Sequence, residues 1–230
     1  MVLKNQVASN LEDLDKEVIK SCVRANRNRK DVKIIAVSKT ISKYPIIDAI
    51  KYGQVFFGEN KVQEAKIKWP EIKSLYPSVK LNMIGPLQTN KVKDALNIFD
   101  TIETIDREKL VLQIIKNKNI IKKNHEFYVQ INIGEEPQKS GCPPHKAASF
   151  INECKLLGLN ISGVMGIAPI NVAPAPYFAL LKNIANELSL KNTSMGMSSD
   201  YEDAIYLGAT SIRIGSRIFG ERKKLLNNNE

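Results

Sequence analysis

Lys39 is the first residue of this chain whose type and position suggest chemistry. It follows the apolar run Ile34–Val37, which has the length of a buried strand, in the segment Ser38-Lys39-Thr40. Burial disfavours the charged form of a lysine, so a partly desolvated amine is more available to attack carbonyl groups. The alternative is an ordinary surface lysine after a strand, because lysine is common in this chain. Lys39 alone therefore does not decide the chemistry.

Two segments near the C-terminus have the composition of a phosphate-binding site. Ser198-Ser199 precedes a predicted helix that begins near Asp200, and Gly215-Ser216 opens a short predicted helix. Backbone amides at helix N-termini and at glycines bind phosphate groups. The alternative for Ser198 or Ser199 is a simple helix cap. If these segments lie beside a reactive lysine, the combination suits a phosphorylated aldehyde.

Arg213 lies between Ile212 and Ile214 in a predicted strand. Side chains alternate along a strand, so we expect Arg213 to point into the interior of the fold, where an unpaired guanidinium is costly. It can pair with a buried carboxylate, or it can face the ring nitrogen of a bound cofactor. In the second case the permanent charge keeps a pyridine nitrogen unprotonated and makes the ring a weak electron sink.

Short apolar segments alternate with longer segments of helical spacing along the chain. Most of the short segments are continuously apolar, as strands buried on both faces are. The predicted strands are Val32–Val37, Gln54–Phe57, Leu81–Ile84, Ile98–Ile102, Phe127–Ile133, Ile161–Ile167, Thr193–Met197 and Ser211–Ile214. The predicted helices are an amphipathic first helix through Val7, Leu11, Leu14, Val18 and Cys22, then Ile46–Tyr52, Lys61–Leu75, Asn90–Leu96, Arg107–Ile120, Lys146–Leu156, Tyr177–Leu188 and Asp200–Leu207.

This alternation predicts an α/β fold, a single (β/α)8 TIM barrel with an extra N-terminal helix, as one domain over residues 1–230. The alternative is an open doubly wound sheet. Chemistry in a barrel lies at the carboxyl ends of the strands. Lys39, Ser198 and Gly215 all follow predicted strands, and strands one and eight become neighbours when a barrel closes. The opposite rim carries ordinary helix ends and charged turns.

The composition bounds the class of protein. The chain has 34 Lys and Arg against 24 Asp and Glu, which gives a formal net charge of +10. The basic residues are spread along the chain, with small clusters at Arg24–Lys30 and Arg222–Lys224, so we interpret them as solvated surface and not as a nucleic-acid site. Three cysteines and two histidines suit neither a disulfide framework nor a metal site.

The hydropathy pattern predicts a cytoplasmic protein. No segment approaches the roughly 18 apolar residues that a membrane-spanning helix needs. The N-terminus becomes polar at once and has no apolar signal core. We therefore expect no membrane association.

Five segments resemble the pyridoxal phosphate homeostasis protein family, which is related to the N-terminal barrel of alanine racemase. They run from the first predicted strand to the eighth, so the resemblance covers nearly the whole chain, and together they are highly specific. The segments are Ala36–Thr40, Phe57–Glu64, Ile84–Lys91, Ser194–Ser198, and Ile212–Ser216 with Phe219-Gly220.

The resemblance implies that the cofactor is pyridoxal 5'-phosphate. It implies that Lys39 forms a Schiff base with the cofactor. Ser198, Gly215 and Ser216 would hold the phosphate group, and Arg213 would face the pyridine nitrogen.

Two further positions take their meaning from the resemblance. Asn60 would lie near the cofactor. Asn82 stands close to the place where the family often has a histidine, just before the Ile-Gly motif of the third strand. This departure puts a proton-transfer role at Asn82 in doubt, but it does not affect cofactor binding.

Three classes of function fit these residues. The first is a non-catalytic carrier or buffer that hands the cofactor to apoenzymes. The second is an amino-acid racemase or related enzyme that depends on pyridoxal phosphate. The third is a class I aldolase or another phosphosugar enzyme with a Schiff-base lysine.

The carrier is the function that we predict. Racemisation needs a second acid or base on the far face of the substrate. In alanine racemase relatives this group comes from a second domain and a partner subunit, and this chain ends where the predicted barrel ends. A local tyrosine such as Tyr52 is a substitute that nothing in the sequence favours, and an aldolase does not need Arg213. We expect a monomer whose partners are pyridoxal phosphate and apoenzymes that depend on it.

Overall fold

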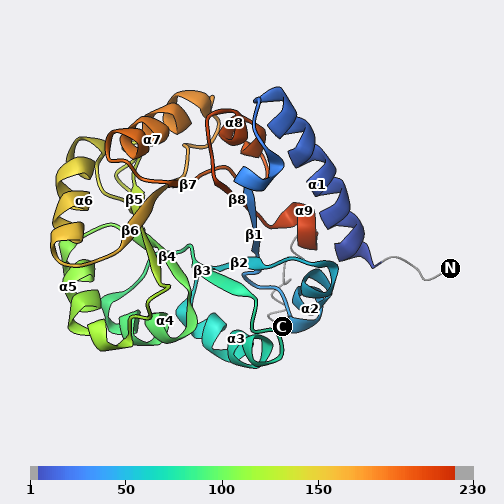
Figure 1. Cartoon of the computed structure of the whole chain (residues 1–230), viewed down its shortest axis with the longest axis horizontal. Helices are drawn as coiled ribbons and strands as arrows, with labels where there is room; N and C mark the ends of the chain where they lie inside the picture. Colours follow the sequence, from blue (N-terminus) through green and yellow to red (C-terminus); the bar gives the residue numbers. More distant parts are fainter. Residues whose placement is uncertain (1–4, 221–230) are drawn as a thin grey trace, which may run out of the picture.

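Eight parallel strands close into a barrel in the computed structural model, which describes residues 5–220 (Figure 1). The order around the barrel is the order along the chain, and β1 pairs with β8 to close it. The predicted barrel is therefore confirmed, and the open sheet is wrong. The strands are β1 (Lys33–Val37), β2 (Phe56–Glu59), β3 (Lys80–Met83), β4 (Thr101–Ile105), β5 (Glu126–Ile131), β6 (Ile161–Gly166), β7 (Asn192–Ser194) and β8 (Ser211–Ile214).

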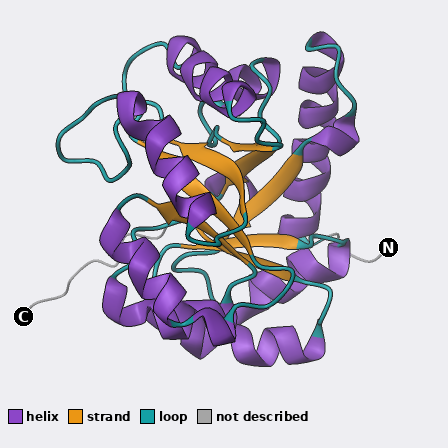
Figure 2. Cartoon of the chain, turned by 60° about the vertical axis from the view of Figure 1, so that its left-hand side comes forward, coloured by secondary structure: helices purple, strands orange, loops and turns teal. Residues whose placement is uncertain are grey.

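Helices surround the barrel on its outside (Figure 2). The α-helices are α1 (Gln6–Arg24), α2 (Lys43–Tyr52), α3 (Val62–Leu75), α4 (Val92–Ile98), α5 (Glu108–Lys116), α6 (Ala147–Leu156), α7 (Ala175–Glu187), α8 (Tyr201–Tyr206) and α9 (Ser216–Phe219). Short 3₁₀ helices are η1 (Arg29–Asp31), η2 (Thr89–Lys91), η3 (Lys118–Ile120) and η4 (Pro144–Lys146). The predicted basic cluster Arg222–Lys224 lies outside the described residues.

The extra N-terminal helix, α1, covers the side of the barrel where β8 meets β1 (Figure 1). It packs against α2, α8 and α9. The Asn10 side chain donates a hydrogen bond to the Ile218 carbonyl at 2.9 Å, which fixes α1 to α9. The apolar residues at helical spacing that the sequence singled out are all buried: Val7, Leu11, Leu14, Val18 and Cys22.

The fourth strand begins at Thr101, whereas the sequence predicted a strand from Ile98. Helix α4 continues to Ile98, and Asp100 then connects the helix to the strand. The Asp100 carboxylate accepts the backbone N–H of Leu81 at 2.8 Å, which holds this connection beside β3. The strand also ends later than predicted, at Ile105. It therefore contains Glu103, which is fully buried in the barrel interior.

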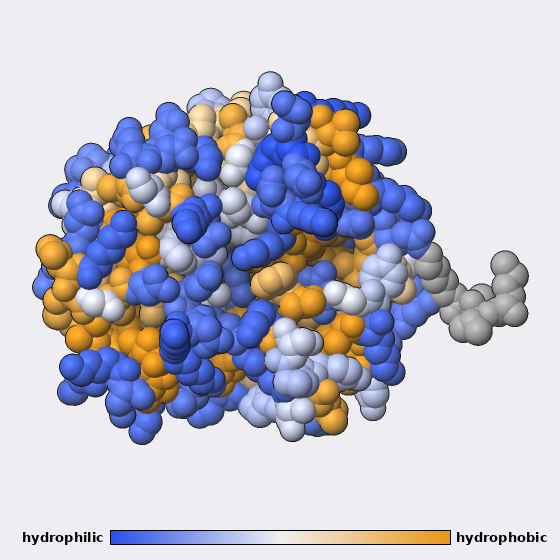
Figure 3. All heavy atoms as spheres, in the orientation of Figure 1, coloured by the Kyte–Doolittle hydropathy of each residue, from blue (hydrophilic) through white to orange (hydrophobic). Residues whose placement is uncertain are grey.

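The described surface is mixed in character. Figure 3 shows hydrophilic residues spread over the face that Figure 1 presents, with apolar residues between them. The most exposed large apolar residues belong to different helices, as Tyr44 in α2, Ile67 in α3 and Leu156 in α6 illustrate. No helix within residues 5–220 has the length and apolar character needed to cross a membrane.

Candidate functional site

One pocket at the carboxyl end of the barrel brings together all the residues that the sequence assigned to the cofactor. Its volume is about 360 Å³, within the range of small-molecule sites. Apolar residues at the ends of the strands, such as Val37 and Ile84, form part of its wall. The predicted residues in its lining are Lys39, Asn60, Ser198, Arg213, Gly215 and Ser216.

Lys39 lies in a tight turn directly after β1, and a buried lysine of α3 holds this turn. Lys68 is 7% exposed, and its ammonium donates hydrogen bonds to the carbonyls of Ser38 at 2.8 Å and Ile41 at 3.1 Å. The two carbonyls flank Lys39 in the sequence. These two hydrogen bonds fix the backbone on either side of Lys39. The half-buried side chain of Lys39 lines the pocket.

Glu59 compensates the charge of Lys68. The Glu59 carboxylate is fully buried and forms an ion pair with the Lys68 ammonium at 2.8 Å. It also accepts hydrogen bonds from the Ser38 hydroxyl at 2.7 Å and the Trp69 indole at 3.1 Å. A buried charge without such partners is strongly destabilising. Sequence reasoning missed both charged residues, although Glu59 lies inside one of the five resembling segments.

Asn60 owes its position to a close contact between two loops. A Cβ atom added to Gly85 would lie 2.3 Å from the Asn60 carbonyl oxygen, so only glycine allows the loop after β3 to approach the loop after β2. This contact places Asn60 in the lining of the pocket, after β2 and next to the turn after β1 that carries Lys39.

The two predicted phosphate-binding serines come together although they are far apart in the sequence. The Ser216 hydroxyl lies 3.3 Å from the Ser198 hydroxyl. The loop before Ser198 turns at Gly196, whose φ is +90°. A Cβ atom added to this glycine would lie 2.6 Å from the Cβ of Ala204. The Asp200 carboxylate accepts the N–H of Met197 at 2.6 Å and fixes the same loop. The hydroxyls and the amides that begin α9 form a donor set suited to an anion.

Arg213 points into the barrel, as its alternation with two isoleucines predicted, and is 5% exposed. Its guanidinium donates to the Ser194 hydroxyl at 2.8 Å and to the Gly166 carbonyl at 2.9 Å. Ser194 in turn donates to the carboxylate of Glu103 at 2.6 Å. Arg213 is therefore connected to a core carboxylate through Ser194, and it also lines the pocket, while its contact with a cofactor ring stays a prediction.

Burial dominates the electrostatics of this network. It raises the pKa of Glu103, and the nearby Arg213 charge opposes that rise. It lowers the pKa of Arg213, against the influence of Glu103. A guanidinium starts from so high a pKa that it keeps its charge in proteins. Arg213 is therefore a fixed cation at the inner end of the pocket.

Asn82 is not part of this pocket. Its side-chain amide donates to Glu103 at 2.6 Å, and the residue lines a different cavity at the amino end of the barrel. A chain of hydrogen bonds thus runs from Arg213 through Ser194 and Glu103 to Asn82. The departure from the family at this position consequently lies away from the predicted cofactor residues.

Comparison with known proteins identifies relatives of this chain. The chain is 35% identical to the pyridoxal phosphate homeostasis protein of Vibrio cholerae, over 94% of this chain and 96% of that protein. The chain belongs to the pyridoxal phosphate homeostasis protein family. The human pyridoxal phosphate homeostasis protein is 37% identical over 83% of this chain and 76% of its own length. No protein-family model matches the sequence.

Solved structures place this family member among known barrels. PipY of Synechococcus elongatus is 31% identical, over 93% of this chain and 100% of PipY. Its TM-score is 0.82 for the structure without pyridoxal phosphate and 0.79 for the structure with pyridoxal phosphate bound. Alanine racemase of Clostridium difficile, 14% identical with a TM-score of 0.68, shares the fold over 91% of this chain and 57% of its own.

Proposed function

We propose that this protein binds pyridoxal 5'-phosphate at the carboxyl end of its barrel and acts as a non-catalytic carrier or buffer of the cofactor. The observation that carries the proposal is the convergence of Lys39, Ser198, Ser216 and Arg213 on one pocket. The names of its relatives support the proposal, as does the PipY structure with pyridoxal phosphate bound.

The donor set of the pocket fits the groups of this cofactor. Pyridoxal phosphate supplies an aldehyde that reacts with a primary amine, a pyridine ring and a phosphate group. Nζ of Lys39 is the amine that would hold the aldehyde carbon covalently, with release of water. The hydroxyls of Ser198 and Ser216 and the backbone amide of Gly215 bind the phosphate, because anions accept hydrogen bonds from hydroxyls and from amides at helix N-termini. Asn60 contributes a polar contact beside the ring.

Arg213 determines what the bound cofactor can do. Its guanidinium is held by Ser194 and Gly166, so it is oriented before any ligand arrives. In our proposal it faces the pyridine nitrogen and keeps this nitrogen unprotonated, which makes the ring a poor acceptor of electrons. Binding is thereby retained while the stabilisation of a substrate carbanion is weak.

The lining of the pocket also favours a carrier over the alternative, a racemase-like enzyme. Lys39 and Arg213 are the ionisable side chains among the described residues that line it. Tyr52, the substitute base considered from the sequence, lies on α2 and is not among these lining residues. A missing proton-transfer group costs a rate factor of about 10² to 10⁴.

We also propose an oligomeric state, a cellular location and partners for this protein. We propose that residues 1–230 act as one domain and as a monomer in the cytoplasm. Its partners would be pyridoxal phosphate and the apoenzymes that receive it, with no nucleic acid or membrane. The scattered positions of exposed apolar residues such as Tyr44 and Leu156 support a monomer, since stable interfaces need a contiguous patch.

A turnover assay separates the carrier from the enzyme. The protein loaded with pyridoxal phosphate is incubated with L-alanine and other L-amino acids, and the products are separated by chiral chromatography. We expect the yellow absorbance of bound cofactor without racemisation. Steady racemisation at roughly 1 s⁻¹ or faster, the ordinary range for enzymes, would overturn the carrier proposal if Lys39→Ala abolished it.

A further inference from the structure

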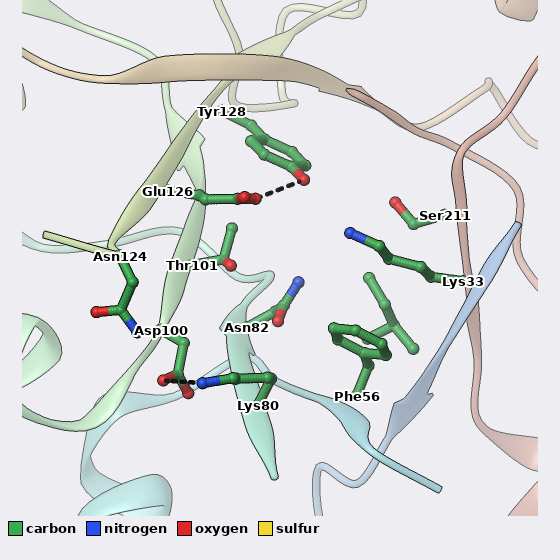
Figure 4. A pocket seen from close by; sticks show the side chains of 11 residues that line it. Lys33, Phe56, Lys80, Asn82, Asp100, Thr101, Asn124, Glu126, Tyr128 and Ser211 are labelled. Carbon is green, nitrogen blue, oxygen red and sulfur yellow. Dashed lines mark hydrogen bonds and ion pairs between the residues drawn. The ribbon is translucent and has the colours of Figure 1, made fainter. Parts of the chain in front are cut away.

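A second cavity lies at the amino end of the barrel, where the sequence predicted only helix ends and charged turns (Figure 4). Its volume is about 260 Å³. The first residues of six strands contribute to its wall, so it is the opposite mouth of the barrel from the cofactor pocket. These residues are Lys33, Phe56, Lys80, Thr101, Glu126 and Ser211.

Lys33 supplies a positive charge on one side of this cavity. Its ammonium points into the cavity and lies 5.3 Å from the centre of the Phe56 ring (Figure 4). Within residues 5–220 it has no carboxylate at ion-pair distance, in contrast to Lys80, which pairs with Asp100 at 3.8 Å. The Lys33 charge is therefore available to a ligand.

Glu126 supplies a negative charge on the other side. Its carboxylate accepts a hydrogen bond from the Tyr128 hydroxyl at 3.2 Å (Figure 4). Among the described residues it forms no ion pair, neither with Lys33 nor with another cation. One uncompensated cation and one uncompensated anion thus face the same space from opposite walls.

Two neutral groups in the lining are buried and have no hydrogen-bond partner in the part of the chain that the structure describes. The Ser211 hydroxyl has none, and Ser211 pairs in register with Lys33 across β8 and β1. The Asn82 carbonyl oxygen also has none, whereas the amide nitrogen of the same side chain donates to Glu103. Buried polar groups almost always have partners, so each is a place where a ligand can bind.

We propose that this cavity binds a free α-amino acid as a zwitterion. The ligand carboxylate binds the Lys33 ammonium and the Ser211 hydroxyl. The ligand ammonium binds the Glu126 carboxylate, with the Asn82 carbonyl oxygen as a second acceptor. Phe56 gives an apolar surface for the ligand side chain. A simple anion would leave the Glu126 charge without a counter-charge, and a simple cation would leave the Lys33 charge without one.

The test uses the cofactor-free protein, because amines also react with pyridoxal phosphate. Uniformly ¹⁵N-labelled protein is titrated with L-alanine, and backbone amide shifts are recorded by NMR. We expect saturable shifts confined to the lining of this cavity, at the first residues of β1, β2, β5 and β8 and around Asn82 in β3. Two charge-assisted contacts at an open cavity give a dissociation constant on the order of 1 mM.

Variants identify the charges that matter. Lys33→Met and Glu126→Gln should each weaken binding about tenfold or more, since each removes a charge-assisted hydrogen bond. Lys116→Met, which changes an exposed lysine of α5 outside the cavity, is the matched control and should bind as the natural chain does. The spectrum of each variant shows whether it is folded, and Ser211→Ala gives a second, smaller change on the Lys33 side.

Acetate and methylammonium serve as probes of the two charges separately. Both should bind much more weakly than L-alanine. If acetate binds as tightly as L-alanine and Glu126→Gln has no effect, the cavity is an anion site and the proposal is wrong. It is equally wrong if L-alanine causes no saturable shifts at the amino end, or causes them only around Lys39.

Discussion

Ser198 and Ser216 are the two residues whose side chains we expect to bind the phosphate group of the cofactor. Their hydroxyls lie 3.3 Å apart in the pocket. A hydrogen bond to a charged group contributes about 1.5–3 kcal/mol, so Ser198→Ala and Ser216→Ala should each weaken pyridoxal phosphate binding about tenfold or more. Spectroscopic titration with the cofactor measures the effect. Ser149→Ala, at an exposed position of α6, is the control, and unchanged affinity in the double variant would contradict the proposed phosphate site.

His125 should make stability depend on pH. It is buried just before β5, where its Nδ1 accepts the N–H of Lys122 at 3.1 Å. Burial lowers its pKa from 6.5. The folded protein therefore holds this histidine neutral, and its contribution is fully present above pH 6.5 and lost as the pH falls through the lowered pKa.

Urea unfolding between about pH 7 and pH 5 measures this contribution as the difference between the natural chain and His125→Gln. The natural chain should lose stability relative to the variant by at most about 1.4 kcal/mol per pH unit. The difference is the useful quantity, because buried carboxyl groups with raised pKa values, Glu103 among them, act in the opposite direction. His145→Gln, at an exposed site, should follow the natural chain, and equal slopes for all three proteins would refute the assignment.

Among the elements, α1 has a clear structural role. Leu14 is 1% exposed on the buried face of α1, the helix that packs against α2, α8 and α9. Leu14→Ala should lower the free energy of unfolding by about 2–5 kcal/mol, as large-to-small changes in well-packed sites do. Leu156→Ala, at a leucine that is 88% exposed, should change it by less than about 0.5 kcal/mol. Similar losses in both variants would show that α1 does not pack as described.

The strands and helices were predictable from the sequence where one face is continuously apolar. Prediction was wrong where a polar residue lies between two elements. Asp100 is such a residue. Its carboxylate accepts the Leu81 N–H, and β4 begins only at the next residue. No local pattern contains that contact. The error hid Glu103, which lies just beyond the predicted end of the strand and is the carboxylate connected to Arg213.

At the candidate site, the residues that line the pocket were predictable and those that position them were not. Lys39 and Arg213 stand out by type, because each is a charged side chain next to apolar strand residues. Lys68 supports the Lys39 turn from a helix that contains several lysines, so its sequence gives no signal. Its role follows from the packing of α3 against the turn after β1, which only the folded chain shows.

The two ends of the barrel carry different chemical groups. The carboxyl end carries the predicted cofactor residues, whereas the amino end carries the opposed charges of Lys33 and Glu126. Buried polar residues, from Arg213 to Asn82, connect the two through the interior. In our proposal the function of the carboxyl end depends on Lys39, because this residue supplies the amine in the pocket.

Borohydride reduction of the protein with bound pyridoxal phosphate tests that claim most directly. Reduction makes the link between lysine and cofactor permanent, and mass spectrometry of the peptides then locates it. We predict that the added mass lies on the peptide containing Lys39 and disappears in Lys39→Arg. Labelling of other lysines with none on Lys39 would contradict the proposed site.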